Sequence, residues 1–262
     1  MYQHQLHQQI NQCVKEKDFP EGDAGILFHT RFIANGAAIK ALYDEIYGSH
    51  PKAAEGFGRL LTIITRGFID RPDAMKDKDD EKLDQGHWFL SNSITGMSLY
   101  VDRFCGELAD MESKLDYLRR LGVNLLHLMP VFESPPNESD GGYAVSDYRS
   151  VDLRFGTLED LRRLRQHMSD RNMFLMLDIV VNHTSHHHEW ARKAKQGIES
   201  FQDYYYMYGD RDLPDRFERG MPEIFPESSP GNFTYCKDIN KWVMTVFHNY
   251  QWDLNYTNPA VL

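Results

Sequence analysis

Apolar positions recur along the chain at two different spacings. From Gly25 to about Ile69 they follow the period of a helix, which predicts two or more amphipathic helices. The turn residues Gly48-Ser49-His50-Pro51 interrupt this pattern and predict a connection between helices. Beyond Trp88, short apolar runs alternate with longer amphipathic segments, which is typical of βα units.

Three strands and two helices are predicted in the second region. We expect strands at Met97–Phe104, Val123–Met129 and Met173–Val181, and helices at Glu112–Leu121 and Thr157–Ser169, the last with its first residue as N-cap. Strands that are apolar on both faces are typical of a parallel sheet covered by helices. The fold class expected from this pattern is α/β.

The stretch from His183 to about Tyr256 is too long for an ordinary βα loop and is rich in aromatic residues, so it predicts an inserted subdomain. We therefore expect an N-terminal helical domain (1–88), the first part of a βα domain (89–183), an insert (184–256) and the start of a further helix (257–262). Most rings of the insert should form its own small core, and a minority could line a cleft.

Composition narrows the classes of function. The formal net charge of -10 argues against a nucleic-acid or membrane-surface binder and fits a protein with neutral ligands. The run Lys76–Lys82 predicts a solvated helix face or a linker. Cys13, Cys105 and Cys236 are odd in number and widely spaced, which indicates neither a disulfide framework nor a metal site. The N-terminus lacks the pattern of a signal peptide, so we expect a cytoplasmic protein without membrane spans.

Candidate chemistry lies where the predicted strands end. Leu177–His183 is an apolar strand with Asp178 and, after a further turn, His183, and parallel barrel folds keep their chemistry at such ends. A neutral imidazole there can donate to a ligand or be structural. The tetrapeptide Asp140-Gly141-Gly142-Tyr143 follows the second strand. Its glycines would allow a close approach to a ligand and its ring offers a flat face to a sugar, although an ordinary turn is the alternative.

A histidine cluster follows the same strand. His186, His187 and His188 suggest zinc, because imidazole is a common zinc ligand. No acidic triad or HExxH arrangement surrounds them, so a solvated loop is the favoured interpretation. We expect no metal and no cofactor, and a zinc protein remains a hypothesis that a metal content measurement would test.

Together these motifs resemble the α-amylase superfamily of barrel glycosidases and transglycosidases. Val123–Pro130 leading to Asp140–Tyr148, then Asp178–His183, then an insert, occur in the order of that family. Within it the sequence is most similar to the amylosucrases. The segments that carry this second likeness are Gly142–Ser146, Ile224–Glu227 with Pro230-Gly231, and Phe247 with Gln251–Tyr256.

The resemblance implies a (β/α)8 TIM barrel, of which only the first three strands would be present, with a B-type insert after the third strand and an N-terminal all-helical domain. It also implies that Tyr143 stacks under the innermost glucosyl ring, that His183 donates to that ring's hydroxyls, and that Asp140 helps to close the pocket. The arginine partner of Asp140 would lie beyond Leu262. The resemblance further implies the substrate-lining rings Phe225 and Phe247.

Two more residues of the region I segment match supporting positions. Asp178 resembles a residue that supports the site by hydrogen bonding. Asn182 matches a position that ligates calcium in many α-amylases, but amylosucrases are not typically calcium enzymes, so no metal is expected here.

The mechanism that the resemblance implies is retaining, with a nucleophile and an acid/base carboxyl roughly 5 Å apart. Sucrose would release fructose, and the glucosyl unit would pass to an α-1,4-glucan. Both carboxylates belong to family segments expected beyond Leu262, so this part alone is expected to be inactive and, with open sheet edges, poorly soluble. Alternatives are a sucrose hydrolase or another α-glucosidase of the superfamily and, in another class, a non-catalytic saccharide-binding module. The oligomeric state stays open.

Overall fold

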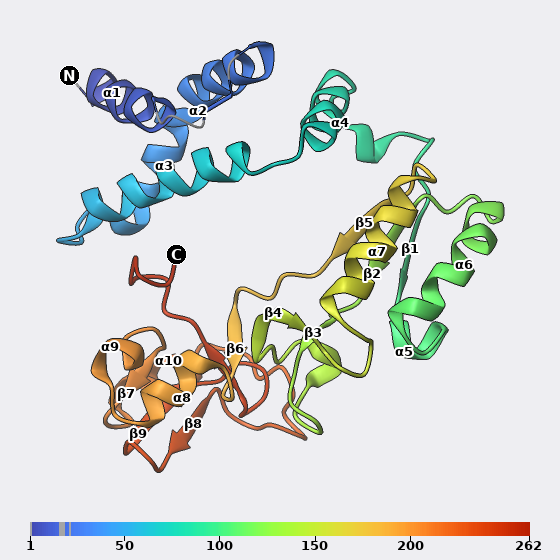
Figure 1. The fold of residues 1–262 in the computed structure, drawn as a ribbon. Helices are drawn as coiled ribbons and strands as arrows, with labels where there is room; N and C mark the ends of the chain where they lie inside the picture. The colour runs from blue at the N-terminus through green and yellow to red at the C-terminus, as the bar shows by residue number, and fades with distance from the viewer. Residues whose placement is uncertain (1, 16–18, 21) are drawn as a thin grey trace. The chain divides into compact units, whose positions relative to one another are not determined.

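The computed structural model describes residues 2–15, 19–20 and 22–262. It divides into two compact units, the first made of Met1–Phe89 with Tyr256–Leu262 and the second of Leu90–Asn255 (Figure 1).

The first unit is helical. The prediction of helices between residues 25 and 69, joined at residues 48–51, is confirmed. Its helices are α1 (Tyr2–Val14), α2 (Asp23–Tyr47), α3 (Ala53–Ile69) and α4 (Asp73–Asp84). Aromatic rings dominate its core, where Phe28 stacks on Phe68 at 4.2 Å between centroids and Tyr43 packs on Phe57. The charged run lies on α4, but Lys76 is buried, with its ammonium 3.0 Å from Asp73.

The second unit contains a parallel three-stranded sheet in the order β1 (Gly96–Leu99), β2 (Leu125–Leu128) and β5 (Phe174–Leu177). Helices α6 (Leu108–Arg120) and α7 (Leu158–Ser169) pack on it and bury a shared aliphatic core (Figure 1). The prediction of a parallel sheet covered by helices, made from the alternation of short strands and amphipathic helices, is confirmed for these elements.

Several predicted boundaries were wrong. The helix predicted from Glu112 already begins at Leu108. The first strand ends at Leu99, and residues 101–104 form a helical turn, α5 (Val101–Phe104), because the N–H groups of Phe104 and Cys105 donate to the carbonyls of Tyr100 and Val101. The third strand ends at Leu177, since residues 178–182 leave the ladder. Residues 257–262 form turns and not the start of a helix.

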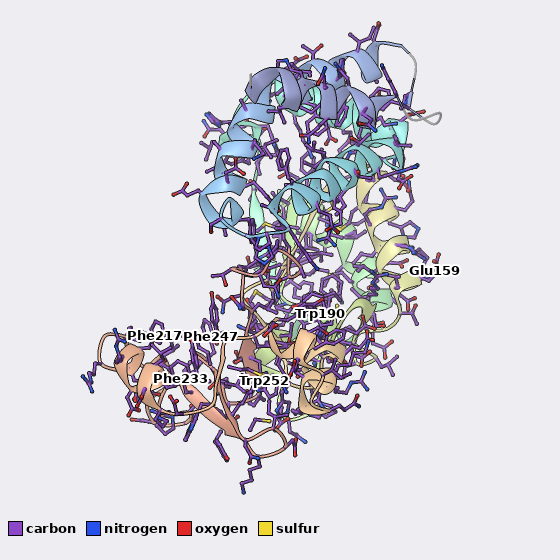
Figure 2. All side chains as sticks on the ribbon, turned by 90° about the vertical axis from the view of Figure 1, so that its left-hand side faces the viewer. Glu159, Trp190, Phe217, Phe233, Phe247 and Trp252 are labelled. Atoms are coloured by element: carbon purple, nitrogen blue, oxygen red, sulfur yellow. The ribbon has the colours of Figure 1, made fainter. Side chains whose placement is uncertain are left out.

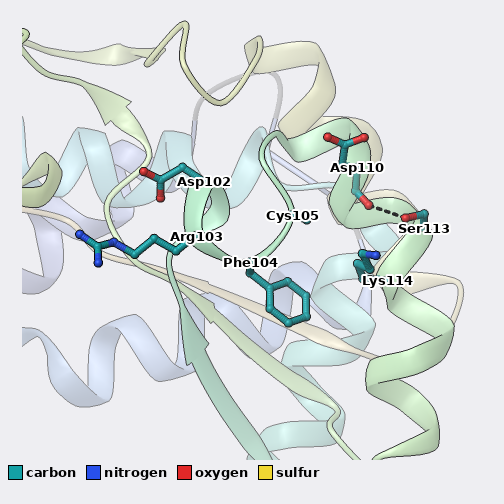
Figure 3. A pocket seen from close by; sticks show the side chains of 7 residues that line it. All are labelled: Asp102, Arg103, Phe104, Cys105, Asp110, Ser113 and Lys114. Carbon is teal, nitrogen blue, oxygen red and sulfur yellow. Dashed lines mark hydrogen bonds between the residues drawn. The ribbon is translucent and has the colours of Figure 1, made fainter.

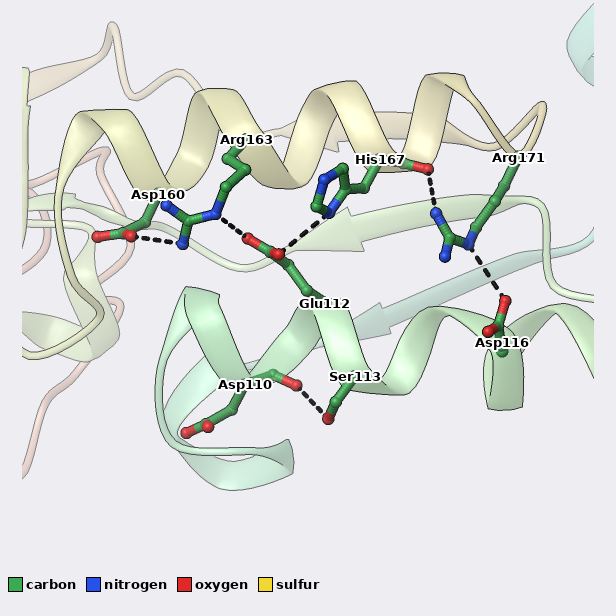
Figure 4. A network of polar contacts seen from close by, with 8 residues as sticks. All are labelled: Asp110, Glu112, Ser113, Asp116, Asp160, Arg163, His167 and Arg171. Atoms are coloured by element: carbon green, nitrogen blue, oxygen red, sulfur yellow. Dashed lines mark hydrogen bonds and ion pairs between the residues drawn. The ribbon is translucent and has the colours of Figure 1, made fainter.

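Charged side chains join α6 to α7. Thr157 is the N-cap of α7, as predicted, in a reciprocal capping box with Asp160. Arg163 donates to Glu112 at 2.7 Å and to Asp160 at 2.8 Å, and His167 Nδ1 lies 3.0 Å from the same Glu112 (Figure 4). These contacts lie on the outside of the unit.

The remaining elements are short. The sequence did not predict the antiparallel pair of β3 and β4, whose residues flank the loop of Asp140. Their bounds and those of the others are β3 (Phe132–Glu133), η2 (Asp140–Gly142), β4 (Asp147–Val151), β6 (His183–Ser185), α8 (Glu189–Lys195), α9 (Glu199–Gln202), β7 (Met207–Tyr208), α10 (Asp212–Glu218), β8 (Phe233–Cys236), β9 (Lys241–Met244), β10 (Gln251–Asp253) and η1 (Trp88–Leu90).

The region after β6 has its own sheet and aromatic core. Strands β7, β9 and β8 pair antiparallel in that order. The rings of Tyr208 and Phe217 both lie against Phe233, with centroids 5.8 Å and 6.3 Å from it (Figure 2). Most rings of this segment therefore pack against one another.

Among the helices that the structure describes, none combines the length and apolarity needed to cross a bilayer. Cys105 and Cys236 carry free thiols, and burial raises the pKa of Cys105 to about 11. The side chain of Cys13 lies outside the described residues.

Candidate functional site

A tight loop between β3 and β4 carries Asp140 and Tyr143. Gly142 has φ 99°, and a Cβ there would lie 2.8 Å from the carbonyl oxygen of Pro130. Gly141 has φ 65°, with the Tyr100 hydroxyl 3.1 Å from the position of a Cβ. The glycines are therefore needed for positive φ and for packing on the protein's own chain, and their role in the approach of a ligand stays a prediction.

His183 begins β6 and is buried, with 4 % of its surface exposed. Its Nε2 lies 3.1 Å from the carbonyl oxygen of Tyr143, and its Nδ1 lies 3.2 Å from the amide nitrogen of Asn182. A ring protonated at Nε2 satisfies both contacts, donating to Tyr143 and accepting from Asn182. Burial lowers the pKa of His183, against the opposing effects of Tyr143 and Asp140, so the ring is neutral near pH 7.

Gln251 contacts two predicted substrate-binding residues, Asp140 and His183. It was not singled out from the sequence as a site residue. It lies on β10, which pairs antiparallel with β6, and is fully buried. Its Nε2 donates to Asp140 Oδ2 at 3.1 Å and lies 3.0 Å from His183 Nε2, while its Oε1 accepts from the N–H of His248 at 3.0 Å. The amide orientation is fixed by the contacts to Asp140 and His248.

Asn182, which directly precedes β6, and the buried Asp253 of β10 form a second link. Asp253 accepts from the Asn182 amide at 3.0 Å and from the N–H of Val246 at 2.8 Å. Burial nevertheless raises the pKa of Asp253 to about 6. Asn182 is thus turned toward a protein carboxyl, and it holds the chain next to His183.

Aromatic rings extend the site from His183. Phe247 lies 5.2 Å from the His183 ring between centroids, and Phe225 lies 6.5 Å from Phe247. Phe225 also stacks on His248 at 4.6 Å, which in turn stacks on Tyr250 at 5.0 Å. The two predicted lining rings therefore belong to one continuous aromatic wall.

Tyr143 connects the loop with the parallel sheet. Its hydroxyl donates to Asp178 Oδ2 at 3.4 Å, and Asp178 Oδ1 lies 3.2 Å from Nε2 of His127. The other nitrogen of His127 lies 2.9 Å from the Ser98 hydroxyl. Burial first, and then the charge of Asp178, raise the pKa of Tyr143, so its hydroxyl stays protonated. A polar line thus runs across β1, β2 and the end of β5. His127 was not predicted for the site, because no motif in the sequence singles it out.

The structure brings all seven predicted residues into this connected set: Asp140, Tyr143, Asp178, Asn182, His183, Phe225 and Phe247. A separate hollow of about 470 Å³ lies beside α5 and α6 (Figure 3). None of its lining residues was predicted for the site: Asp102, Arg103, Phe104, Cys105, Asp110, Ser113 and Lys114.

Residues 68–262 match the family model for the alpha amylase catalytic domain. The chain belongs to the alpha-amylase family. Its members are glycoside hydrolases and transferases, and their catalytic domain is a TIM-barrel fold.

Similar proteins fall on several branches of this family. The chain is 38 % identical over 160 residues to an oligo-1,6-glucosidase of Bacillus cereus and 34 % identical over 165 residues to an alpha-glucosidase of Schizosaccharomyces pombe. Each match covers 60 % of this chain and 27 % of the relative, so the chain spans about a quarter of the length of these proteins.

The chain is also similar to solved structures of isomaltulose and trehalulose synthases. The isomaltulose synthase of Erwinia rhapontici NX5, seen with its natural substrate sucrose, matches with a TM-score of 0.56 and 30 % identity over 64 % of this chain and 30 % of that one. The trehalulose synthase MutB of Pseudomonas mesoacidophila MX-45 matches with a TM-score of 0.56 and 28 % identity over 64 % and 31 % of the two chains.

Proposed function

We propose that this chain supplies part of the glucosyl-binding pocket of a retaining α-glucosyl-transferring enzyme that uses sucrose. The observation that carries the proposal is the polar set in which the buried Gln251 donates to Asp140 and lies 3.0 Å from His183, and in which His183 donates to the Tyr143 carbonyl. Such a set fixes one carboxylate, one neutral imidazole and one aromatic ring relative to each other, which is what orienting a polar sugar requires.

Each side chain then has a chemical role. The Tyr143 ring gives a platform for the apolar face of the glucosyl ring, and Phe225 and Phe247 give an apolar wall. Asp140 accepts from sugar hydroxyls. His183 donates its Nε2–H to a sugar hydroxyl in place of the Tyr143 carbonyl. This change of acceptor needs only a small movement of the ring, because the hydroxyl would lie next to that carbonyl. The insert (184–256) contributes one side of this pocket in the proposal.

The finer proposal is an amylosucrase-type reaction. A carboxylate attacks the anomeric carbon of the glucosyl unit, fructose leaves with a proton from a carboxylic acid, and the glucosyl unit passes to an α-1,4-glucan. We place both reacting carboxyls on family segments outside residues 1–262. The free thiols of Cys105 and Cys236 support a reducing cytoplasm as the compartment.

A second candidate is hydrolysis, because the oligo-1,6-glucosidase shares 38 % identity with this chain. Incubation with sucrose and a short α-1,4-glucan separates the candidates. We would compare the 262-residue chain with a version extended by the downstream reading frame. Fructose with lengthened glucan supports the proposal, whereas equal amounts of glucose and fructose indicate a hydrolase and a sucrose isomer an isomerase. Fructose release by the short chain would refute our placement of the carboxyls.

The pocket itself is tested by Tyr143→Ala. Losing the stacking platform should weaken the binding of glucose or sucrose by at least about tenfold, as measured by ligand-observed NMR titration of the chain. Tyr117→Ala is the matched control, because this tyrosine is exposed on α6. Equal binding by both variants would contradict the role of Tyr143.

A further inference from the structure

Three potential metal ligands meet outside the sugar site. Glu138 lies on the loop between β3 and η2, and His186 and His187 lie in the turn between β6 and α8. Glu138 Oε2 lies 2.9 Å from Nε2 of His186 and 3.4 Å from Nε2 of His187. One ligand atom from each residue falls within 4.8 Å of the other two, and among the described residues this is the set of three that does so.

The backbone holds the two imidazoles in place. The N–H of His186 donates to the carbonyl of Tyr250 at 2.8 Å, and the N–H of His187 donates to the hydroxyl of the buried Ser185 at 3.1 Å. The rings are 4.5 Å apart between centroids and nearly perpendicular, at 80°. Both Nε2 atoms therefore converge on one carboxylate oxygen, although the sequence suggested a solvated loop.

The spacing suits a small divalent cation. Zinc bonds of about 2.0–2.1 Å in a tetrahedron place neighbouring ligand atoms about 3.3 Å apart. The two observed separations from Glu138 bracket this value. Two imidazole nitrogens and one carboxylate oxygen are ligands that zinc prefers, and water can complete the tetrahedron.

One nearby charge opposes a cation. The ammonium of Lys195 lies over the ring of Trp252 at 5.2 Å, and that ring lies 6.5 Å from His186. The charge of Lys195 acts on the His186 ring electrostatically. Lys195 should therefore weaken a metal site without contributing a ligand to it.

We propose that Glu138, His186 and His187 bind a divalent transition metal of the zinc class. Glu138 precedes Asp140 by two positions, and His186 follows His183 by three. The metal ties the loop of Asp140 and Tyr143 to the turn after β6, and its role is to hold these two segments together. The inference is independent of the substrate assigned to the sugar pocket.

The test is calorimetric titration of the metal-stripped chain, prepared without a histidine tag, with Zn²⁺ alone. We expect one site whose Kd rises at least about tenfold in His187→Gln and in Glu138→Gln. His187 is 53 % exposed, so its replacement should leave the fold intact. His167→Gln is the matched control, because among the described residues that histidine pairs with a single carboxylate, that of Glu112.

Lys195→Met should act in the opposite direction and tighten zinc binding by about threefold to tenfold, which loss of structure would not do. Co²⁺ offers a second readout, since a site with few ligands gives it a strong visible band that His187→Gln should abolish. The proposal is overturned if the parent chain binds no zinc, or if His187→Gln and Glu138→Gln bind it as His167→Gln does.

Discussion

Two polar junctions in the Leu90–Asn255 unit differ in what surrounds them. Between α6 and α7, Arg163 bridges Glu112 and Asp160 on the outer surface (Figure 4). Beside β6 and β10, the buried side chains of Gln251 and Asp253 hydrogen-bond Asp140 and Asn182. Both junctions join segments that lie far apart in the sequence.

Polar contacts should contribute more to stability at the inner junction than at the outer one. Exposed ion pairs exchange water for a partner at little net gain, because solvent screens them and long side chains lose freedom. A buried amide has no water to replace a lost partner, so removing it leaves other groups unsatisfied. The inner junction should therefore control both stability and the geometry of the sugar site.

Gln251→Ala should have the largest effect. It leaves a part-buried Asp140 oxygen and the His248 N–H without this partner and opens a cavity at a fully buried position, so we expect a loss of about 4 kcal/mol in the free energy of unfolding, measured with urea. Gln166→Ala is the matched control, because that glutamine bonds Asp170 on the surface of α7. Similar losses in both variants would remove the contrast between the junctions.

The inner junction should also respond to pH through Asp253. Its folded pKa of about 6 exceeds the ordinary 3.8, so the folded state binds this proton more tightly. The resulting stability is fully present below about pH 3.8 and is lost as pH rises through about 6, a change of about 3 kcal/mol. Relative to the parent, Asp253→Asn should gain about this amount between about pH 4 and about pH 7.

Asp152→Asn gives the comparison of opposite sign. Burial would raise the pKa of Asp152, but hydrogen bonds from Arg154 lower it below the ordinary value. Its stabilising effect is therefore present above pH 3.8 and lost as pH falls, so the variant should lose stability relative to the parent as pH rises. Unfolding by urea at several pH values measures both profiles, and parallel profiles would contradict the assignment for Asp253.

Local signals in the sequence predicted much of the fold. The helical period between residues 25 and 69 and the N-cap at Thr157 are set by neighbours in the chain, and both were found. The end of the first strand was missed because a run of apolar residues does not distinguish β1 from the turn of α5. The pair of β3 and β4 was missed because each strand is too short to give a period.

The site residues could be proposed from the sequence, but their partners could not. Tyr143 and His183 stood out through motifs beside strand ends. Gln251 contacts His183 across 68 positions, and Glu138 contacts His186 across 48. Such contacts depend on the pairing of β6 with β10 and on the path of the loop before η2. Neither can be predicted from local patterns in a single sequence. The histidine cluster was assigned to solvent for this reason.

Arg163→Gln should have the smallest effect and completes the contrast. It removes the ion pair of Arg163 with Glu112 on α6 and the pair with Asp160 within α7, yet the guanidinium is exposed, so the thermal midpoint should fall by at most about 2 °C. Salt should erase even this difference, because exposed charges are screened at about 1 M. Thermal unfolding at low and high salt measures it, with Arg165→Gln as a control elsewhere on α7. A loss of stability as large as that of Gln251→Ala, or one that persists in salt, would mean that the outer junction also contributes strongly to the stability of the unit.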